Sequence, residues 1–272
     1  MAGGEVGVGA PPRHPVRGRL PRVALLCLLP LAGQEPALRY AAAVLADAAF
    51  LESVATSIRT QVGAATRVES VGREGRWQFR TAPEGAGVRL ESWYDSLRVW
   101  READGARVEP DTDGLVGGRY RGVLSPDGRY TPAARPFLPA EVAAVTDLAD
   151  AMLRFLPPLP PAALAESAQW DGDGLRIVRR PDSLAVGERL WRFRWVRQQA
   201  DTTREWASDS ASYQVRTTLR ETGDLAWHAR LGPVAWLRRV TLEVEIPADG
   251  AVRRASRSRI EERTVVRRLA PA

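Results

Sequence analysis

The sequence predicts a mainly β protein of the α+β class, built on one large curved antiparallel sheet or half-barrel with one amphipathic helix at about 140–156. Three observations support this prediction. Apolar and polar residues alternate over several long runs, which is the pattern of strands with one buried face. Turn-forming pairs such as Asp-Gly separate these runs. A single stretch shows apolar residues at helical spacing.

The 272 residues divide into a leader and a β-rich remainder. The apolar run 23–33 follows several arginines, and its length suits a signal peptide but is too short to span a membrane. We therefore predict that 1–34 form a signal peptide or disordered leader and that 35–272 form a single β-rich domain. The protein is then periplasmic or secreted, and not transmembrane after processing. Two alternatives stay open, namely lipidation of Cys27 and a buried N-terminal helix.

The net charge of +6 is unevenly distributed. Arginine supplies every basic side chain, and the excess lies at the ends, with +3 over residues 1–33 and +5 over residues 251–272. The body between them therefore carries −2, whereas nucleic-acid proteins usually have a basic body, so we predict no nucleic-acid partner. The C-terminal arginines fit a solvated edge strand, or alternatively a surface for anionic lipid.

Few side chains with catalytic or metal-binding chemistry are present. One cysteine and two histidines exclude a disulfide framework and disfavour a zinc site, so we predict no metal and no cofactor. His228 has no GxSxG serine to accompany it and is predicted to be a solvated surface side chain. We predict no catalytic residues, although a hydrolase that uses two carboxylates stays as an alternative.

The first half of the β-rich region reads as strands joined by tight turns. Residues 38–60 are predicted as strands, and residues 66–100 as two long antiparallel strands joined through Pro83–Gly87. Ser125-Pro-Asp-Gly128 is a turn sequence, so Gly118–Leu124 should pair with Arg129–Thr131 as a hairpin. Glycines inside these strands mark bulges or places where a ring or another backbone comes close.

The amphipathic helix predicted at about 140–156 would begin near Pro139 and stop at Pro157-Pro158. After it, Leu190–Arg197 has a clear strand pattern. Residues 201–210 are polar and predicted as a loop, and Tyr213–Leu219 and Leu225–Leu231 as a hairpin around Glu221-Thr-Gly-Asp224. Val240–Ile246 alternates as a further strand, and a last arginine-rich strand ends near Leu269.

Three stretches together resemble a family of uncharacterised exported bacterial proteins of unknown function: Pro110–Gly122, Phe155–Pro160 and Arg180–Ser183. This resemblance implies export and brings no activity. Many long strands with one amphipathic helix are also similar to periplasmic lipoprotein-carrier folds, in which a curved antiparallel sheet wraps an apolar cavity. That second similarity is an analogy of fold alone.

The function expected from these observations is non-catalytic binding of a lipid, amphiphile or other hydrophobic ligand in a cleft of the sheet. The aromatic and apolar side chains most suited to line that cleft are Trp191, Phe193, Trp195, Met152 and Tyr120. Core packing is the simpler role for most of the nine tryptophans. A second hypothesis is a structural or envelope-assembly protein that binds a protein partner through an exposed apolar patch or an open sheet edge.

Overall fold

Twelve antiparallel β-strands and three short helical turns make up the described chain. The structure is a computed structural model that describes residues 38–185, 187–208, 211–248 and 254–270. The leader predicted for 1–34, its boundary with the β-rich domain and Cys27 lie outside these residues. The elements are α1 Ala42–Leu45, β1 Ala49–Val62, β2 Ala65–Glu84, β3 Gly87–Ala103, β4 Ala106–Val108, β5 Tyr120–Leu124, β6 Tyr130–Ala134, α2 Ala140–Ala143, the 3₁₀ turn η1 Ala151–Arg154, β7 Gln169–Gly172, β8 Leu175–Ala185, β9 Glu188–Ser208, β10 Ala211–His228, β11 Gly232–Ile246 and β12 Ser256–Arg268.

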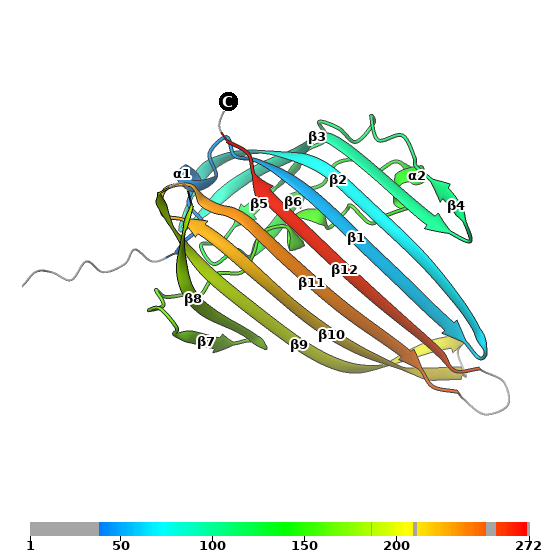
Figure 1. Cartoon of the computed structure of the whole chain (residues 1–272). Helices are drawn as coiled ribbons and strands as arrows, with labels where there is room; N and C mark the ends of the chain where they lie inside the picture. Colours follow the sequence, from blue (N-terminus) through cyan, green and yellow to red (C-terminus); the bar gives the residue numbers. More distant parts are fainter. Residues whose placement is uncertain (1–37, 186, 209–210, 249–253, 271–272) are drawn as a thin grey trace, which may run out of the picture. The chain divides into compact units, whose positions relative to one another are not determined.

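The strands form one open sheet in the order β6-β5-β3-β2-β1-β12-β11-β10-β9-β8-β7, with β4 paired to β3 (Figure 1). Each half of this order is a run of neighbouring strands joined mostly by tight turns. The two halves meet where β1 pairs with β12 along nearly all of β1, from Phe50 to Val62. The predicted mainly β class and large antiparallel sheet are therefore confirmed.

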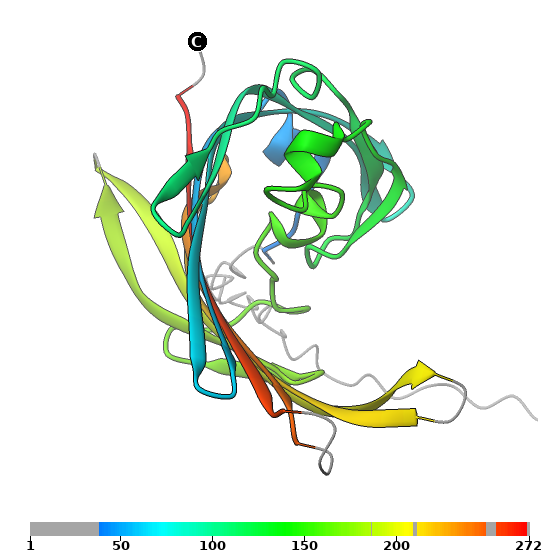
Figure 2. The ribbon, with the colours of Figure 1, turned by 90° about the vertical axis from the view of Figure 1, so that its right-hand side faces the viewer.

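Residues 135–168, here called the crossing segment, connect the two outermost strands, β6 and β7. Figure 2 shows the sheet curving around this segment, which carries α2 and η1. The side of the sheet that faces the crossing segment is called the concave face below. Two tyrosine hydroxyls fix the segment there: that of Tyr40 donates to the carbonyl of Pro157 at 2.9 Å, and that of Tyr120 donates to the carbonyl of Leu148 at 2.8 Å.

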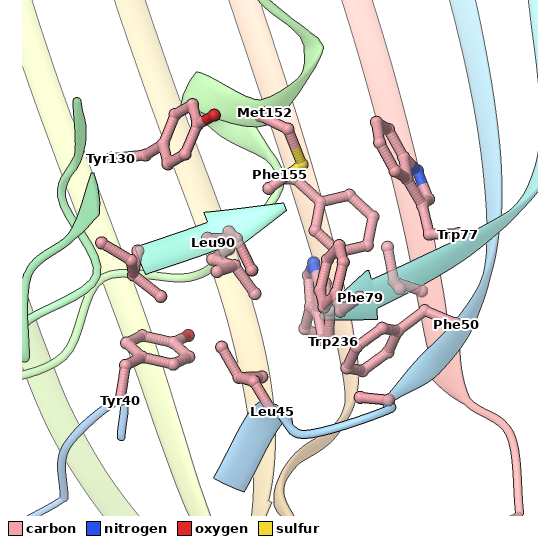
Figure 3. Close-up of a cluster of buried hydrophobic side chains, with 14 of the residues drawn as sticks. Tyr40, Leu45, Phe50, Trp77, Phe79, Leu90, Tyr130, Met152, Phe155 and Trp236 are labelled. Atoms are coloured by element: carbon pink, nitrogen blue, oxygen red, sulfur yellow. The ribbon is translucent and has the colours of Figure 1, made fainter. Parts of the chain in front are cut away.

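The hydrophobic core lies between the crossing segment and the sheet, with Phe155 at its centre (Figure 3). The ring centroid of Phe155 lies 5.1 Å from that of Trp77 on β2 and 5.2 Å from that of Trp236 on β11. Phe50 and Phe79 complete the cluster. Because β2 and β11 belong to different halves of the sheet, this one ring packs against both of them. The contacts of Phe155 with Phe50, Phe79 and Trp236 are edge-to-face, a geometry that adds to the energy of area burial.

Several local expectations hold in detail. β2 and β3 pair around the predicted turn, and β5 pairs with β6 as the predicted hairpin. The glycine of β5 marks a close approach, since a Cβ on Gly122 would lie 2.6 Å from Cζ of Tyr130. The alternation of Trp191, Phe193 and Trp195 places all three on the buried side of β9.

The helix predicted over 140–156 forms only in two short pieces, α2 and η1. Between them, the carboxylate of Asp147 accepts a hydrogen bond from the backbone N–H of Ala149 at 2.9 Å. A side-chain bond of this type competes with the helical backbone bond and favours a turn. The apolar residues that set the helical spacing are nevertheless buried, namely Val142, Val145, Leu148, Met152 and Leu156. The apolar periodicity therefore predicted correctly which residues are buried, but the predicted helix is longer than the helical pieces that form.

One loop and one turn were placed wrongly in the C-terminal half. Residues 201–208, predicted as a loop, continue β9, and they pair with β10 as in Thr203 opposite Val215. The hairpin predicted around Glu221–Asp224 is also wrong, because β10 runs unbroken through Gly223. The ring of Trp195 covers this glycine, and a Cβ there would lie 1.9 Å from Cζ2 of that ring. The glycine therefore serves ring packing within a strand rather than a turn.

Two smaller expectations also need correction. Residues 38–48, predicted as strand, contain the helical turn α1. His228 is buried, with 6 % of its surface exposed, rather than solvated. Its Nδ1 accepts from the backbone N–H groups of Arg230 and Leu231, and its Nε2 lies 2.6 Å from a carboxylate oxygen of Glu188. The imidazole thus satisfies the backbone of the β10–β11 turn, a role that alternation alone does not reveal.

Candidate ligand-binding site

The long strands extend beyond the crossing segment (Figure 1), and aliphatic side chains continue along the concave side of several of them. At their centre is a row of four half-buried side chains in direct register: Ile58 on β1 opposes Ile260 on β12, which opposes Leu242 on β11, which opposes Leu219 on β10. Val240, Val244 and Ile246 lie on the same side of β11. We call these seven residues the apolar panel.

The panel shares a face with the core because residues two apart on a strand point to the same side. Trp236 of β11 belongs to the core, and Val240 and Leu242 follow it at even spacing. The intervening positions, such as Glu243, point to the opposite side. There Glu243 pairs with Arg257 and Arg259 at 3.1 and 3.2 Å. The distal part of β11 is therefore amphipathic, with aliphatic side chains on its concave side and ion-paired side chains on its convex side.

A row of charged side chains separates the core from the panel. It crosses six adjacent strands, β2, β1, β12, β11, β10 and β9, and we call it the ionic belt; its members are Arg73, Glu52, Glu262, Arg238, Glu221 and Arg197. Arg238 bridges two acids, with its guanidinium 3.0 Å from Glu221 and 3.1 Å from Glu262. Arg73 binds Glu52 in a bidentate manner, at 2.8 and 3.1 Å.

Two acids of the belt are almost completely buried, with 5 % exposure each for Glu52 and Glu221. A buried charge is costly unless it is paired and hydrogen-bonded. Glu52 accepts from the indole N–H of Trp77 at 3.0 Å and from the hydroxyl of Tyr94 at 3.1 Å. Glu221 accepts from the indole N–H of Trp195 at 3.0 Å. Each acid thus ties the ionic belt to an aromatic side chain of the core.

The pKa of Glu221 makes the stability of this region depend on pH. Burial by itself would raise the pKa of this carboxyl, but Arg238, the bond from Trp195 and the charge of Arg197 outweigh it and leave the pKa below its ordinary value of 4.5. A lowered folded-state pKa contributes stability that is complete above the unfolded value and is lost as the pH falls through the folded value.

We therefore expect the free energy of unfolding to fall as the pH decreases below about 4.5, the ordinary value for this carboxyl. Glu221→Gln should be less stable at neutral pH and should lose less stability between neutral and acidic pH. Denaturant titrations at a series of pH values measure this. Glu205→Gln, at an exposed position on β9, is the control and should keep the wild-type slope. If the free energy of unfolding depended on pH equally in the wild type and in Glu221→Gln, the pH dependence could not be attributed to Glu221.

Two cavities lie between the crossing segment and the sheet. The larger has a volume of about 510 Å³ and is bounded by Trp195, Trp236 and the proline-rich stretch Leu156–Pro161. The smaller, of about 240 Å³, reaches the panel at Ile58. Arg154, Phe155 and Arg238 line both cavities. The two cavities are therefore neighbours that meet at these three side chains, with the apolar panel at the far side of the smaller one.

The five ligand-binding residues predicted from the sequence are all buried, but only Trp195 lines the larger cavity. Phe193 and Met152 pack in the core, and the guanidinium of Arg179 lies 5.8 Å from the ring of Trp191. Tyr120 holds the crossing segment through its hydroxyl. Ligand binding by these five residues stays a prediction.

Sequence reasoning did not find the panel or the belt. Their members are scattered over β1, β2 and β9–β12, and only the pairing register brings them together. The alternation of β11 from Trp236 to Ile246 is the one local signal of both features, because it places an aromatic ring, an arginine and four aliphatic side chains on one face.

Comparisons with known proteins give a loose structural similarity. No family model matches the sequence, and no curated protein matches it. A solved structure of lipovitellin, whose description concerns lipid–protein interactions, aligns with a TM-score of 0.44 at 10 % identity, over 84 % of this chain and 26 % of that chain. A DUF1329 family protein from Desulfovibrio piger aligns with a TM-score of 0.14 at 11 % identity, over 80 % and 84 %. This chain thus spans about a quarter of the lipovitellin chain, and neither similarity carries an argument about its function.

Among the described residues, no helix has the length and hydropathy needed to cross a membrane.

Proposed function

We propose that the protein binds an amphiphile with one or more alkyl chains, which lie on the apolar panel with the polar head at the ionic belt. The observation that supports this most directly is the register row Ile58–Ile260–Leu242–Leu219. Four aliphatic side chains are aligned on a concave face and remain only half-buried in the described structure. An apolar surface of this kind, bordered by charged groups, marks a binding site in many soluble proteins.

The dimensions of the panel suit an extended alkyl chain. From Val240 to Ile246 the strand advances six residues, or roughly 20 Å at the usual rise of an antiparallel strand. Each methylene moved from water to such a surface contributes about 0.8 kcal/mol, which is nearly a fourfold gain in affinity. Affinity should therefore rise with chain length until the chain is longer than the panel.

The expected test of the panel is Leu242→Gln. A half-buried leucine that a ligand covers completely contributes about 1.5 kcal/mol, so the substitution should weaken binding of a saturated fatty acid about tenfold. Isothermal titration calorimetry on the full chain, with dodecanoate and tetradecanoate below their micellar concentrations, measures the dissociation constants.

Leu237→Gln is the matched control, since Leu237 is a half-buried leucine on the same strand but on the opposite face. It should bind as the wild type does. Equal weakening by the two variants, or no binding of either fatty acid to the wild type, would remove the proposal. Thermal unfolding of both variants checks that the fold is intact.

Export to the periplasm or the cell exterior is part of this proposal, because a carrier of amphiphiles acts where its ligand must cross water. It rests on residues 1–34, which lie outside the described structure. Deletion of residues 1–34, with fractionation of the producing cell, tests this. The full chain should reach the exported fraction, and the chain without these residues should not.

A further inference from the structure

The larger cavity combines apolar walls with an excess of positive charge. Trp170, Trp195, Trp236 and Phe155 supply the aromatic walls. The charged side chains that line it are four arginines and three acids: Arg129, Arg154, Arg197, Arg238, Asp127, Asp173 and Glu221. At about 510 Å³ the cavity lies within the usual size range of small-molecule sites.

The arginines of the cavity differ in whether they form ion pairs. Arg197 and Arg238 pair with Glu221 in the ionic belt. Arg129 and Arg154, by contrast, have exposed side chains, and within the described residues neither guanidinium has an ion pair or hydrogen bond. Arg154 is the better placed of the two, because it also lines the smaller cavity that reaches Ile58 of the apolar panel.

Tyr130 supplies a second, independent observation. This side chain lines the larger cavity with 7 % of its surface exposed, and its buried hydroxyl has no hydrogen-bond partner within the described structure. Buried hydroxyls are almost always hydrogen-bonded, so an unpaired one calls for a partner. Burial raises the pKa of Tyr130 to about 12, so the hydroxyl stays protonated near neutral pH and can donate to an oxygen acceptor.

We propose that the head group of the bound amphiphile is acidic, and that its anionic oxygen enters the larger cavity to accept hydrogen bonds from Arg154 and Tyr130. This inference rests on the proposed function. The chemistry that the two donors share is a carboxylate or phosphate oxygen; the guanidinium favours either over a neutral hydroxyl. The alkyl chain leaves past Arg154 toward Ile58 and the panel.

The experiment compares three probes with the same twelve-carbon chain: dodecanoate, dodecyl phosphate and the neutral glycerol monoester of dodecanoic acid. Calorimetric titration of the full chain should show at least one of the two anions binding about tenfold more tightly than the neutral ester, as expected for a charge-assisted hydrogen bond. The anion that shows the larger preference identifies carboxylate or phosphate as the head.

The variant Arg154→Gln should weaken binding of the preferred anion about tenfold and leave the neutral ester unchanged. Tyr130→Phe should weaken the same anion a few-fold. Because this variant removes an unpaired buried hydroxyl, it should not lower the stability of the ligand-free protein. Arg216→Gln is the control. The residues of β10 that face the concave side have odd numbers, so the exposed Arg216 lies on the convex side.

The outcomes separate this inference from the proposed function. If wild type binds the anions and the neutral ester equally, or if Arg154→Gln and Arg216→Gln have equal effects, the acidic head is refuted while amphiphile binding stands. If no probe binds, both proposals fail. Raising the salt concentration should weaken binding of the anions and not that of the ester, since only the former depends on charge.

Discussion

Replacing Glu52 by alanine should lower the free energy of unfolding by about 3–5 kcal/mol, the usual cost of removing one partner from a buried ion pair. The substitution would leave the guanidinium of Arg73, the indole N–H of Trp77 and the hydroxyl of Tyr94 without their acceptor. All three donors lie beside the aromatic core.

Urea denaturation followed by tryptophan fluorescence measures this loss. Glu261→Ala is the matched control, because Glu261 is an exposed acid on β12 whose one ion pair among the described residues is with the neighbouring exposed Arg259. Its removal should change the stability by less than about 1 kcal/mol. A loss of less than about 1 kcal/mol for Glu52→Ala would show that the buried carboxylate is not the anchor described above.

Gly223→Ala should cost about 3 kcal/mol, although alanine usually stabilises a strand relative to glycine. The new Cβ would lie 1.9 Å from Cζ2 of Trp195, whose side chain is almost completely buried. The indole cannot remain in place, and its movement would also break the 3.0 Å bond that it donates to Glu221. One added methyl group therefore disturbs both the core and the ionic belt.

The readouts are the denaturation midpoint and the near-ultraviolet circular dichroism of the tryptophans. Gly114→Ala provides the comparison, since the nearest atom to its new Cβ would be Cγ of Pro139 at 3.6 Å, an ordinary van der Waals contact. That variant should lie within about 0.5 kcal/mol of the wild type. Similar losses at the two glycines would mean that a general intolerance of the backbone to a side chain, and not the ring of Trp195, determines the effect.

Local patterns were sufficient for the class of fold and for many of its strands. The alternation of Trp191, Phe193 and Trp195 identified a buried strand face, and the turn Ser125–Gly128 identified a hairpin. These signals work because the hydrophobic pattern of a strand with one solvent-exposed face repeats every two residues. Turn residues, in turn, act through their own backbone angles.

The failures arose where a distant residue decides the local structure. Glu221-Thr-Gly-Asp224 has the composition of a turn, yet the ring of Trp195 on the neighbouring strand makes Gly223 a strand residue. Similarly, residues 201–208 are polar enough for a loop, and only their pairing with β10 reveals a strand.

The candidate site was largely beyond prediction for the same reason. Ile58 and Ile260 lie near opposite ends of the described chain, and nothing in either neighbourhood indicates the other. The ionic belt combines single charges from six adjacent strands, so its ion pairs depend on the register between those strands. What could be foreseen was the kind of face, apolar on one side of long strands, and not the residues that compose it.

The order of the strands has a consequence for how the polypeptide can be assembled. The strands from β1 to β6 associate mostly with their sequence neighbours, as do the strands from β7 to β12, so each group can form through local contacts that close short loops. The seam between β1 and β12, together with the ring of Phe155, unites the groups. If the chain were split after the proline-rich stretch, each of the two fragments would carry a complete set of adjacent strands. The fragments could then reconstitute the sheet by pairing β1 with β12.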